Sequence, residues 1–357
     1  MTTLARRDDA ELTRDFASWC AHRWPDATHE VVALTRPKSG WANETVLVTT
    51  KSRTGDDERH DRFVVRLPPT LATWPEYDLA AQARVLDALA PTDVPVPRVI
   101  ALEDDAQWLG APFLVMSHEP GRAGAEMPAF DPWLVDASVT EQRRLHESFV
   151  AMLASIHRVD WRVAGLDRVL RSSETSLAGE IAWWRDYIEW AADGEPTAAL
   201  AAAIAWCAST APEIENGAQV SLCWGDARIG NVLFADDRAI TAVLDWEMAT
   251  IGPAETDLAW YLALDELTTY FTKRSVAGFL GRSELIDVYE QALGRAVTHL
   301  EWHEIFALTR SVAINERQAR LAATTGIPYP GIAGDENPVL LVLSKKIDEH
   351  GRASTPG

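Results

Sequence analysis

A change of hydrophobic period near residue 118 constrains the fold of this chain more than any other feature. Before it, short apolar runs alternate with turn-forming residues over 31–40, 41–50, 62–69 and 94–121, as β-strands do. After about residue 134, apolar residues recur every three to four positions, which is typical of amphipathic helices. The sequence therefore predicts an α+β protein with a strand-rich N-terminal part and a larger, mostly helical C-terminal part.

The N-terminal part is expected to contain five strands, a leading helix over 8–23 and a second helix over 77–91. The polar run 51–61 is interpreted as a hairpin loop. We place an N-terminal lobe at 1–117, a helical lobe at 118–350 and a frayed tail at 351–357. Within the helical lobe the pattern breaks once, around 220–247, where short apolar runs flank a polar loop.

Composition excludes several classes of protein. The net charge of −20 over 357 residues argues against nucleic-acid binding, which needs a basic face; it favours solubility, and alternatively a cationic substrate. No apolar window is long enough for a membrane span or a signal peptide. The scattered Cys20, Cys207 and Cys223 fit neither a disulfide framework nor a zinc site, so we expect a cytoplasmic protein.

Three polar residues around the break in the helical pattern suggest a chemical site. Asp226 and Asn231 lie five residues apart in a loop after a strand-like run, and Asp245 closes the following hairpin. Taken alone, Asp226 and Asn231 are equally well explained by an Asx-rich turn. One hairpin would bring all three together, however, and hard oxygen ligands suit Mg²⁺ across the phosphates of ATP.

The ordered set of motifs resembles the aminoglycoside phosphotransferase and choline kinase family, whose members are relatives of protein kinases. The loop D-x-x-x-x-N is followed by a hairpin and Asp245-Trp246-Glu247, and further matching segments lie in family order at 93–97, 112–116, 153–157 and 252–260. The resemblance covers roughly residues 30–265 and is greatest to the branch fused to acyl-CoA dehydrogenases. It implies a two-lobed fold with a small five-stranded antiparallel lobe carrying one main helix and a larger helical lobe.

The resemblance also implies roles for individual residues. Asp226 would be the catalytic residue that receives the acceptor hydroxyl, and Asn231 and Asp245 would hold Mg²⁺. Trp224, Arg228 and Asp257 would support them, with Asp257 bracing the loop. The residues expected to bind the nucleotide are Ser39, Gly40, Asn43, Arg66, Gln82, Met116, Ser117 and Glu119.

Three positions depart from the family pattern. Trp224 replaces a histidine and is expected to fill its volume while losing a polar contact. Arg66 replaces the phosphate-binding lysine, and Gln82 replaces the glutamate that pairs with it. We hypothesise that Arg66 contacts the α- and β-phosphates and that Gln82 orients it by a hydrogen bond. Arginine offers a planar fork where lysine offers a point charge.

These features favour an ATP- and Mg-dependent kinase acting on a hydroxyl of a small molecule, as a monomer or homodimer that binds neither nucleic acid nor membranes. A nucleotide-binding pseudokinase is the alternative; a protein kinase is weaker, because no Gly-x-Gly-x-x-Gly loop is present. The acceptor is left open between aminoglycoside-like, macrolide-like and hydroxyacyl compounds. His157 is interpreted as a core histidine with satisfied hydrogen bonds, and Trp183, Trp184 and Trp190 as packing residues of the helical lobe.

Overall fold

The computed structural model describes residues 7–37, 43–170, 177–211, 220–325 and 337–353. The chain forms two compact units, one comprising 1–87, 97–118 and 317–330, and the other comprising 88–96, 119–316 and 331–357. The first unit contains a five-stranded sheet, and the second is mostly helical.

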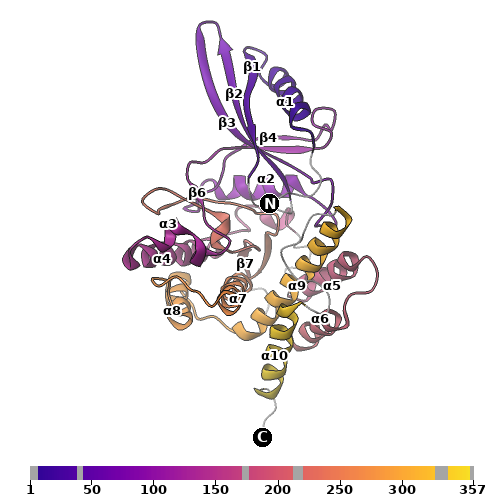
Figure 1. Cartoon of the computed structure of the whole chain (residues 1–357), viewed down its shortest axis with the longest axis vertical. Helices are drawn as coiled ribbons and strands as arrows, with labels where there is room; N and C mark the ends of the chain where they lie inside the picture. The colour runs from indigo at the N-terminus through magenta and orange to yellow at the C-terminus, as the bar shows by residue number, and fades with distance from the viewer. Residues whose placement is uncertain (1–6, 38–42, 171–176, 212–219, 326–336, 354–357) are drawn as a thin grey trace. The chain divides into compact units, whose positions relative to one another are not determined.

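The sheet of the first unit has the strand order β1-β2-β3-β5-β4 (Figure 1). Neighbouring strands run antiparallel throughout. The elements of this unit are α1 (Asp9–Arg23), β1 (Thr28–Thr35), β2 (Glu44–Thr54), β3 (Asp57–Leu67), α2 (Leu79–Leu89), β4 (Val99–Glu103) and β5 (Phe113–Ser117). The five expected strands and both helices are therefore confirmed.

Helix α1 covers one face of this sheet. The Asp8 side chain caps its N-terminus by accepting the Ala10 and Glu11 amides, both at 2.9 Å. The helix buries Phe16 and Trp19, and together with alternate residues of β2 and β3 they form the core of the unit. One apolar stripe on α1 thus meets one apolar face of the sheet.

The expected hairpin loop at 51–61 is wrong, because β2 and β3 continue through it to a tight turn. Gly55 has φ 61°, a conformation that glycine adopts without strain. Lys51 and Arg53 each pair with Glu58 across the strands at 2.8 Å. Polar residues can thus form an exposed ladder that looks like a loop in sequence.

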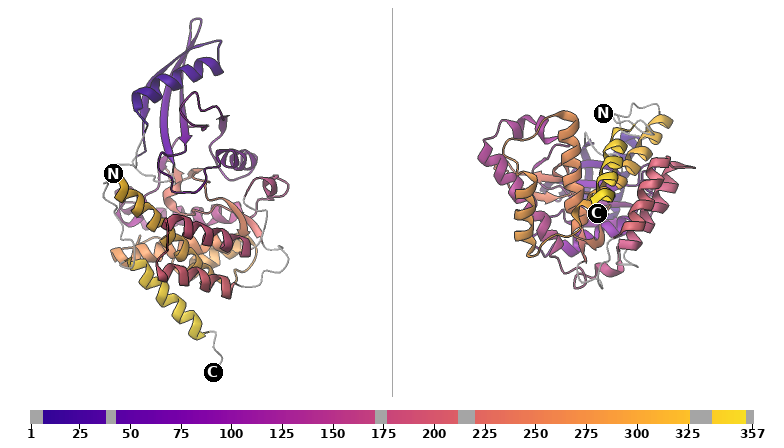
Figure 2. Two further views of the ribbon diagram at one scale, coloured as in Figure 1. Left: turned by 90° about the vertical axis from the view of Figure 1, so that its right-hand side faces the viewer. Right: turned by 90° about the horizontal axis from the view of Figure 1, so that it is seen from below.

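The second unit is built from helices with short strands between them. Its helices are α3 (Pro132–Val135), α4 (Val139–His157), α5 (Leu177–Ala192), α6 (Ala198–Thr210), α7 (Glu255–Thr272), α8 (Arg282–Leu293), α9 (Leu300–Thr325, which continues into the first unit) and α10 (Pro338–Ala353). A capping box formed by Ser138 and Glu141 starts α4. Figure 2 shows α5 and α6 as neighbouring helices. Trp184 and Tyr187 of α5 are buried and, with the half-buried Trp183 and Trp190, form an aromatic cluster.

Two small sheets carry the loops of this unit. They consist of β7 (Val220–Cys223) with β10 (Thr250–Pro253), and of β6 (Arg122–Ala123), β8 (Val232–Phe234) and β9 (Ile240–Val243). The strand-like runs expected around 220–247 are thereby confirmed. Helix α10 reaches Ala353, so residues 351–353 are helical where a frayed tail was expected, and 354–357 lie outside the described residues.

Two further observations concern the chain as a whole. None of the described helices combines the length and the hydropathy that a bilayer crossing requires. The cysteines Cys20, Cys207 and Cys223 are all free and buried. Burial raises the pKa of Cys20 and of Cys207 to about 12, so these thiols stay protonated.

Candidate active site

The loop 224–231 connects β7 to β8 and carries the central residues of the site. Gly225 has φ 91°, and a Cβ atom there would lie 2.2 Å from the Met248 carbonyl oxygen. Only glycine fits this position, because the backbone needs a left-handed conformation and the space for a side chain is taken. The sharp turn at Gly225 leads directly into Asp226.

Three side chains from different parts of the unit fix the carboxylate of Asp226. Arg228 Nε donates to Oδ2 at 2.9 Å and Asn231 Nδ2 to the same oxygen at 2.7 Å. Trp260 Nε1, from α7, donates to Oδ1 at 3.0 Å. These three hydrogen bonds fix the orientation of the Asp226 side chain.

Asn231 and Asp245 lie at the adjoining ends of β8 and β9. Val232 pairs with Val243, and the Leu244 amide donates to the Asn231 carbonyl at 2.8 Å. Asp245 follows with φ 62°, a left-handed conformation that aspartate tolerates better than most residues. The backbone therefore places these two residues at adjoining strand ends.

Arg228 joins Asp226 to a carboxylate not foreseen from the sequence. Its guanidinium pairs with Glu126 as well as with Asp226. Loss of water around its carboxyl raises the pKa of Glu126, and the negative charges of Asp226 and Asp245 raise it further against the opposing effect of Arg228. Burial disfavours the charge on Arg228, but Asp226, Glu126 and Asp245 outweigh it and the pKa of Arg228 rises. The centre is thus strongly acidic, with one arginine partly neutralising it.

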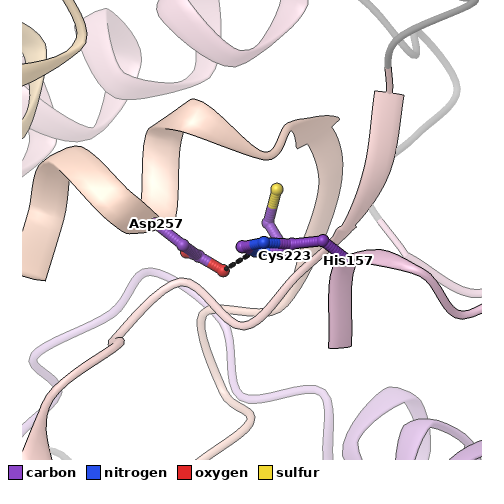
Figure 3. Close-up of side chains that lie close together, drawn as sticks. All are labelled: His157, Cys223 and Asp257. Carbon is purple, nitrogen blue, oxygen red and sulfur yellow. Dashed lines mark hydrogen bonds and ion pairs between the residues drawn. The ribbon is translucent and has the colours of Figure 1, made fainter. Parts of the chain in front are cut away.

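Asp257, at the start of α7, braces the loop from the protein interior. It is fully buried and accepts the Trp224 amide at 2.6 Å and the Gly225 amide at 2.8 Å. His157 Nε2 donates to the same carboxylate at 3.0 Å (Figure 3), and His157 Nδ1 is 2.6 Å from the Tyr289 hydroxyl. His157 is therefore a core histidine with both ring nitrogens bonded, as expected.

His157, Cys223 and Asp257 have the spacing of a metal site among the described residues, but their chemistry does not fit one. Figure 3 shows the Cys223 side chain beside the His157–Asp257 pair. The thiol lies 3.3 Å from the Pro253 carbonyl oxygen, and burial together with Asp257 raises the pKa of Cys223 well above its ordinary value. Both ring nitrogens of His157 are already bonded, to Tyr289 and to Asp257, so the imidazole has no lone pair left for a metal and this cluster is structural.

Trp224 keeps a polar contact, contrary to expectation. Its ring is fully buried, and its indole N–H donates to the carbonyls of Leu244 at 2.8 Å and Asp245 at 3.2 Å. The expectation failed because the larger indole reaches across to the backbone around Asp245, where it can donate.

In the sheet unit, the expected hydrogen bond between Arg66 and Gln82 is present. Arg66 Nη1 donates to Gln82 Oε1 at 2.9 Å, and Gln82 is buried on α2. Arg66 lies near the end of β3, where the resemblance places the phosphate-binding cation. The hydrogen bond hypothesised between Arg66 and Gln82 is thus present, and the pair carries the positive charge of Arg66 alone.

The other residues expected to bind nucleotide are more scattered. Met116 is buried in β5, and the amide of Ser117 already donates to the Arg98 carbonyl at 2.9 Å. Asn43 lies directly before β2, while Ser39 and Gly40 lie outside the described residues. Glu119 belongs to the helical unit.

Three residues of this centre were not assigned roles from the sequence. Trp260 lies three positions after Asp257, and this spacing places both on one face of a helix. Arg310 is fully buried, and its Nη2 donates to the Gly225 carbonyl at 3.1 Å; a lone charge within the apolar stretch 305–314 was the available signal. Glu126, in the segment between β6 and α3, gave no comparable signal.

Comparison with known families decides the relationship. Residues 33–303 match the model of the phosphotransferase enzyme family APH. The chain belongs to this family. The APH match includes Arg66, Gln82 and the whole loop from Trp224 to Asp257, so the departures noted above are variations within the family.

Curated relatives of this APH chain are longer proteins. It is 26% identical over 294 residues to the probable acyl-CoA dehydrogenase IBR3 of Arabidopsis thaliana, covering 77% of the chain and 34% of the relative. It is 28% identical over 201 residues to acyl-CoA dehydrogenase family member 10 of Mus musculus, covering 56% and 18%. The chain thus matches about a third or less of these relatives.

Solved structures share the phosphotransferase fold. A predicted aminoglycoside phosphotransferase from Ralstonia eutropha JMP134 has a TM-score of 0.68 and 22% identity, covering 96% of this chain and 99% of the other. Macrolide 2'-phosphotransferase type I has a TM-score of 0.55 and 18% identity, covering 97% and 99%. A thermostable mutant of aminoglycoside phosphotransferase APH(4)-Ia, in ternary complex with AMP-PNP and hygromycin B, has a TM-score of 0.50 and 15% identity, covering 96% and 99%.

Proposed function

We propose that this chain is an ATP- and Mg-dependent phosphotransferase that moves the γ-phosphoryl group to a hydroxyl of a small molecule. The observation that carries the proposal is the Asp226 carboxylate, fixed by three donors beside the adjoining Asn231 and Asp245. Phosphoryl transfer depends on positioning and on charge stabilisation more than on covalent help from the protein. A fixed carboxylate next to oxygen ligands supplies both.

The side chains present fit a magnesium ion. Asn231 uses its Nδ2 on the backbone and side-chain oxygens of Asp226, at 3.1 and 2.7 Å, which leaves its Oδ1 as a hard oxygen donor. Together with the carboxylate of Asp245, it offers the ligand type that Mg²⁺ prefers. Bound there, Mg²⁺ would neutralise charge on the phosphates during transfer.

The residues of the chain would then have separate roles in binding the acceptor, the phosphates and the adenine. Asp226 would orient the acceptor hydroxyl and take its proton. Arg66, oriented by Gln82, would hold the α- and β-phosphates through a charge-assisted hydrogen bond. The adenine would lie against Met116, Ser117 and Glu119. Asn43, with Ser39 and Gly40, would cover the phosphates.

For the acceptor we retain three classes: aminoglycoside-like, macrolide-like and hydroxyacyl compounds. The names of the similar solved structures support the first two, and the curated relatives named as acyl-CoA dehydrogenases support the third. The acidic centre formed by Asp226, Asp245 and Glu126 is compatible with a cationic acceptor. A panel with members of each class separates them.

A nucleotide-binding pseudokinase with a regulatory role is the second candidate. The Arg66–Gln82 pair favours it, because Gln82 carries no charge where the family pattern has the glutamate of a lysine–glutamate ion pair. Against it, Asp226, Asn231 and Asp245 are all in place and oriented.

Two measurements test the proposal on the full chain. Calorimetric titration with ATP, with and without Mg²⁺, should give Mg-dependent binding. ADP release should rise with at least one acceptor of the panel. Asp226→Ala should lower turnover by about 10²-fold or more, the range expected for a lost catalytic base, and leave Mg·ATP affinity within about twofold. Binding without turnover on any acceptor would favour the pseudokinase; absence of nucleotide binding would reject both candidates.

A further inference from the structure

The two oxygens of Asp226 have different surroundings, and this difference has a chemical consequence. Oδ2 accepts two hydrogen bonds, from Arg228 Nε at 2.9 Å and Asn231 Nδ2 at 2.7 Å. Oδ1 accepts one hydrogen bond from the described residues, from Trp260 Nε1 at 3.0 Å. A carboxylate oxygen has about two lone-pair positions. Oδ2 is therefore fully used, while Oδ1 has one position left.

The carboxylate is still accessible to an acceptor. The Asp226 side chain keeps 14% of its surface exposed, whereas Trp260 is buried with only 4% exposed. An incoming hydroxyl can therefore reach Asp226, and Oδ1 is the oxygen with a lone pair to receive it. The indole N–H occupies the other lone pair of that oxygen and fixes the direction in which the free one points.

Arg310 holds the Trp260 ring in place. Its guanidinium carbon lies 4.8 Å from the Trp260 ring centroid and 4.9 Å from that of Trp184, so the cation lies against both indoles. Its Nη2 donates to the Gly225 carbonyl at 3.1 Å. Arg310 thereby connects α9 to the indole and to the residue immediately before Asp226.

We propose that the acceptor hydroxyl binds to Oδ1 of Asp226, and that Trp260 is the positioning residue that aims this oxygen. The inference rests on the proposed phosphotransferase function. In the step, the acceptor O–H bond breaks and its proton passes to Oδ1. The acceptor oxygen forms a bond to the γ-phosphorus of the nucleoside triphosphate, and the bond from that phosphorus to the β,γ-bridging oxygen breaks, releasing the diphosphate.

Trp260→Phe isolates the indole N–H, because phenylalanine keeps an aromatic ring for Arg310. Trp184→Phe is the matched control: Trp184 also lies against Arg310 and also loses an N–H, but that N–H donates to Glu180 at 2.9 Å. The first measurement is ADP release from Mg·ATP with water as the acceptor, alongside the dissociation constant of AMP-PNP. Trp260→Phe should slow ADP release at least tenfold with AMP-PNP affinity within twofold, and Trp184→Phe should stay within twofold in both.

A second measurement does not depend on turnover. Indole ¹H–¹⁵N spectra of the full chain identify the Trp260 signal by its loss in Trp260→Phe and the Trp184 signal in the same way. Asp226→Ala should shift the Trp260 indole proton upfield and leave the Trp184 signal unmoved.

The positioning role would be overturned by a Trp260 signal unmoved by Asp226→Ala, or by a Trp260→Phe variant that releases ADP at more than half the wild-type rate. Equal losses of turnover and AMP-PNP affinity would also overturn it, since they would indicate general structural damage. Failure of the proposed function has a different signature, because the wild-type chain itself would then release no ADP, whether or not it binds AMP-PNP.

Discussion

The indole N–H of Trp224 donates to the main-chain carbonyl of Leu244 at 2.8 Å. The same N–H lies 3.2 Å from the carbonyl oxygen of Asp245. A side chain from the start of the loop 224–231 therefore holds the backbone that carries the second proposed metal ligand. Asp245 has a left-handed φ of 62°, which is strained for a residue other than glycine. The hydrogen bonds from Trp224 therefore help to hold this strained conformation.

Removing this N–H should loosen the site more than the fold. Trp224→Phe is expected to cost about 1–3 kcal/mol of stability, the range for leaving a buried partner unsatisfied, and to raise the Mg²⁺ concentration needed for half-maximal ADP release about threefold or more. Trp161→Phe is the control, because that indole also donates to a backbone carbonyl, of Val220 at 3.3 Å, away from Asp245. An equal Mg²⁺ requirement in both variants would contradict the role given to Trp224.

Gly225 should not tolerate a side chain. Alanine there would combine a left-handed φ of 91° with a Cβ only 2.2 Å from the Met248 carbonyl oxygen. We expect Gly225→Ala to destabilise the chain by about 3 kcal/mol or more, as overpacking and backbone strain add, measured by urea unfolding. Gly281→Ala should change stability little, because nothing lies within 4 Å of a Cβ at that position. Comparable unfolding midpoints for the two variants would refute this account of the turn.

Arg66 should contribute more to nucleotide affinity than Gln82, because only Arg66 carries a charge. Arg66→Ala should weaken binding of Mg·ATP at least tenfold, because the cation and its hydrogen bonds to phosphate are lost together. Gln82→Leu should weaken Mg·ATP binding only about threefold. The charged guanidinium of Arg66 remains, and only its hydrogen bond to the neutral Gln82 side chain is lost. Titration calorimetry measures both constants. If Arg66→Ala binds as tightly as wild type, Arg66 does not hold the phosphates.

Buried His146 should make stability depend on pH. Its Nδ1 accepts the Leu280 amide at 2.8 Å, and its Nε2 is bonded to the Tyr261 hydroxyl at 2.7 Å. Burial lowers the pKa of His146 to about 3 from 6.5. The unfolded chain therefore binds a proton below pH 6.5 that the folded chain does not, and this contribution to stability is lost as the pH falls from 6.5 toward 3.

The size of the effect is limited by linkage. For one histidine, the free energy of unfolding changes by at most about 1.4 kcal/mol per pH unit. Urea unfolding of wild type and His146→Gln at pH 7.5, 6.5 and 5.5 measures it. The variant should be less stable at neutral pH, and its stability should fall less steeply with acid. Parallel curves would show that His146 contributes no such dependence.

The fold could be predicted largely from hydrophobic period, while the geometry of the site could not. The alternation before residue 118 and the helical spacing after 134 are local signals, and they gave the strands and helices. The exposed ladder at 51–61 was missed because its charged residues resemble a loop in sequence, whereas the structure pairs them across two strands.

Within the site, the predictable residues are those whose spacing along the chain matches their chemistry. Asp226, Asn231 and Asp245 are close in sequence, and a single hairpin brings them together. Trp260, Arg310 and Glu126 reach the centre from distant segments, so their contacts depend on tertiary packing. Trp224 was expected only to fill volume, yet its indole N–H donates to backbone carbonyls. A sequence motif does not reveal the distance from a side chain to a backbone carbonyl.

The three protonated, buried thiols can report when the structure around each of them opens. Cys20 lies in the sheet unit, and Cys207 and Cys223 lie in the helical unit. An alkylating reagent attacks only thiolates that reach solvent, so each cysteine would be modified only when its surroundings open. Mass spectrometry of the alkylated peptides over time would therefore time the opening of the two units separately, and Cys223 would report on the interior directly behind the catalytic loop.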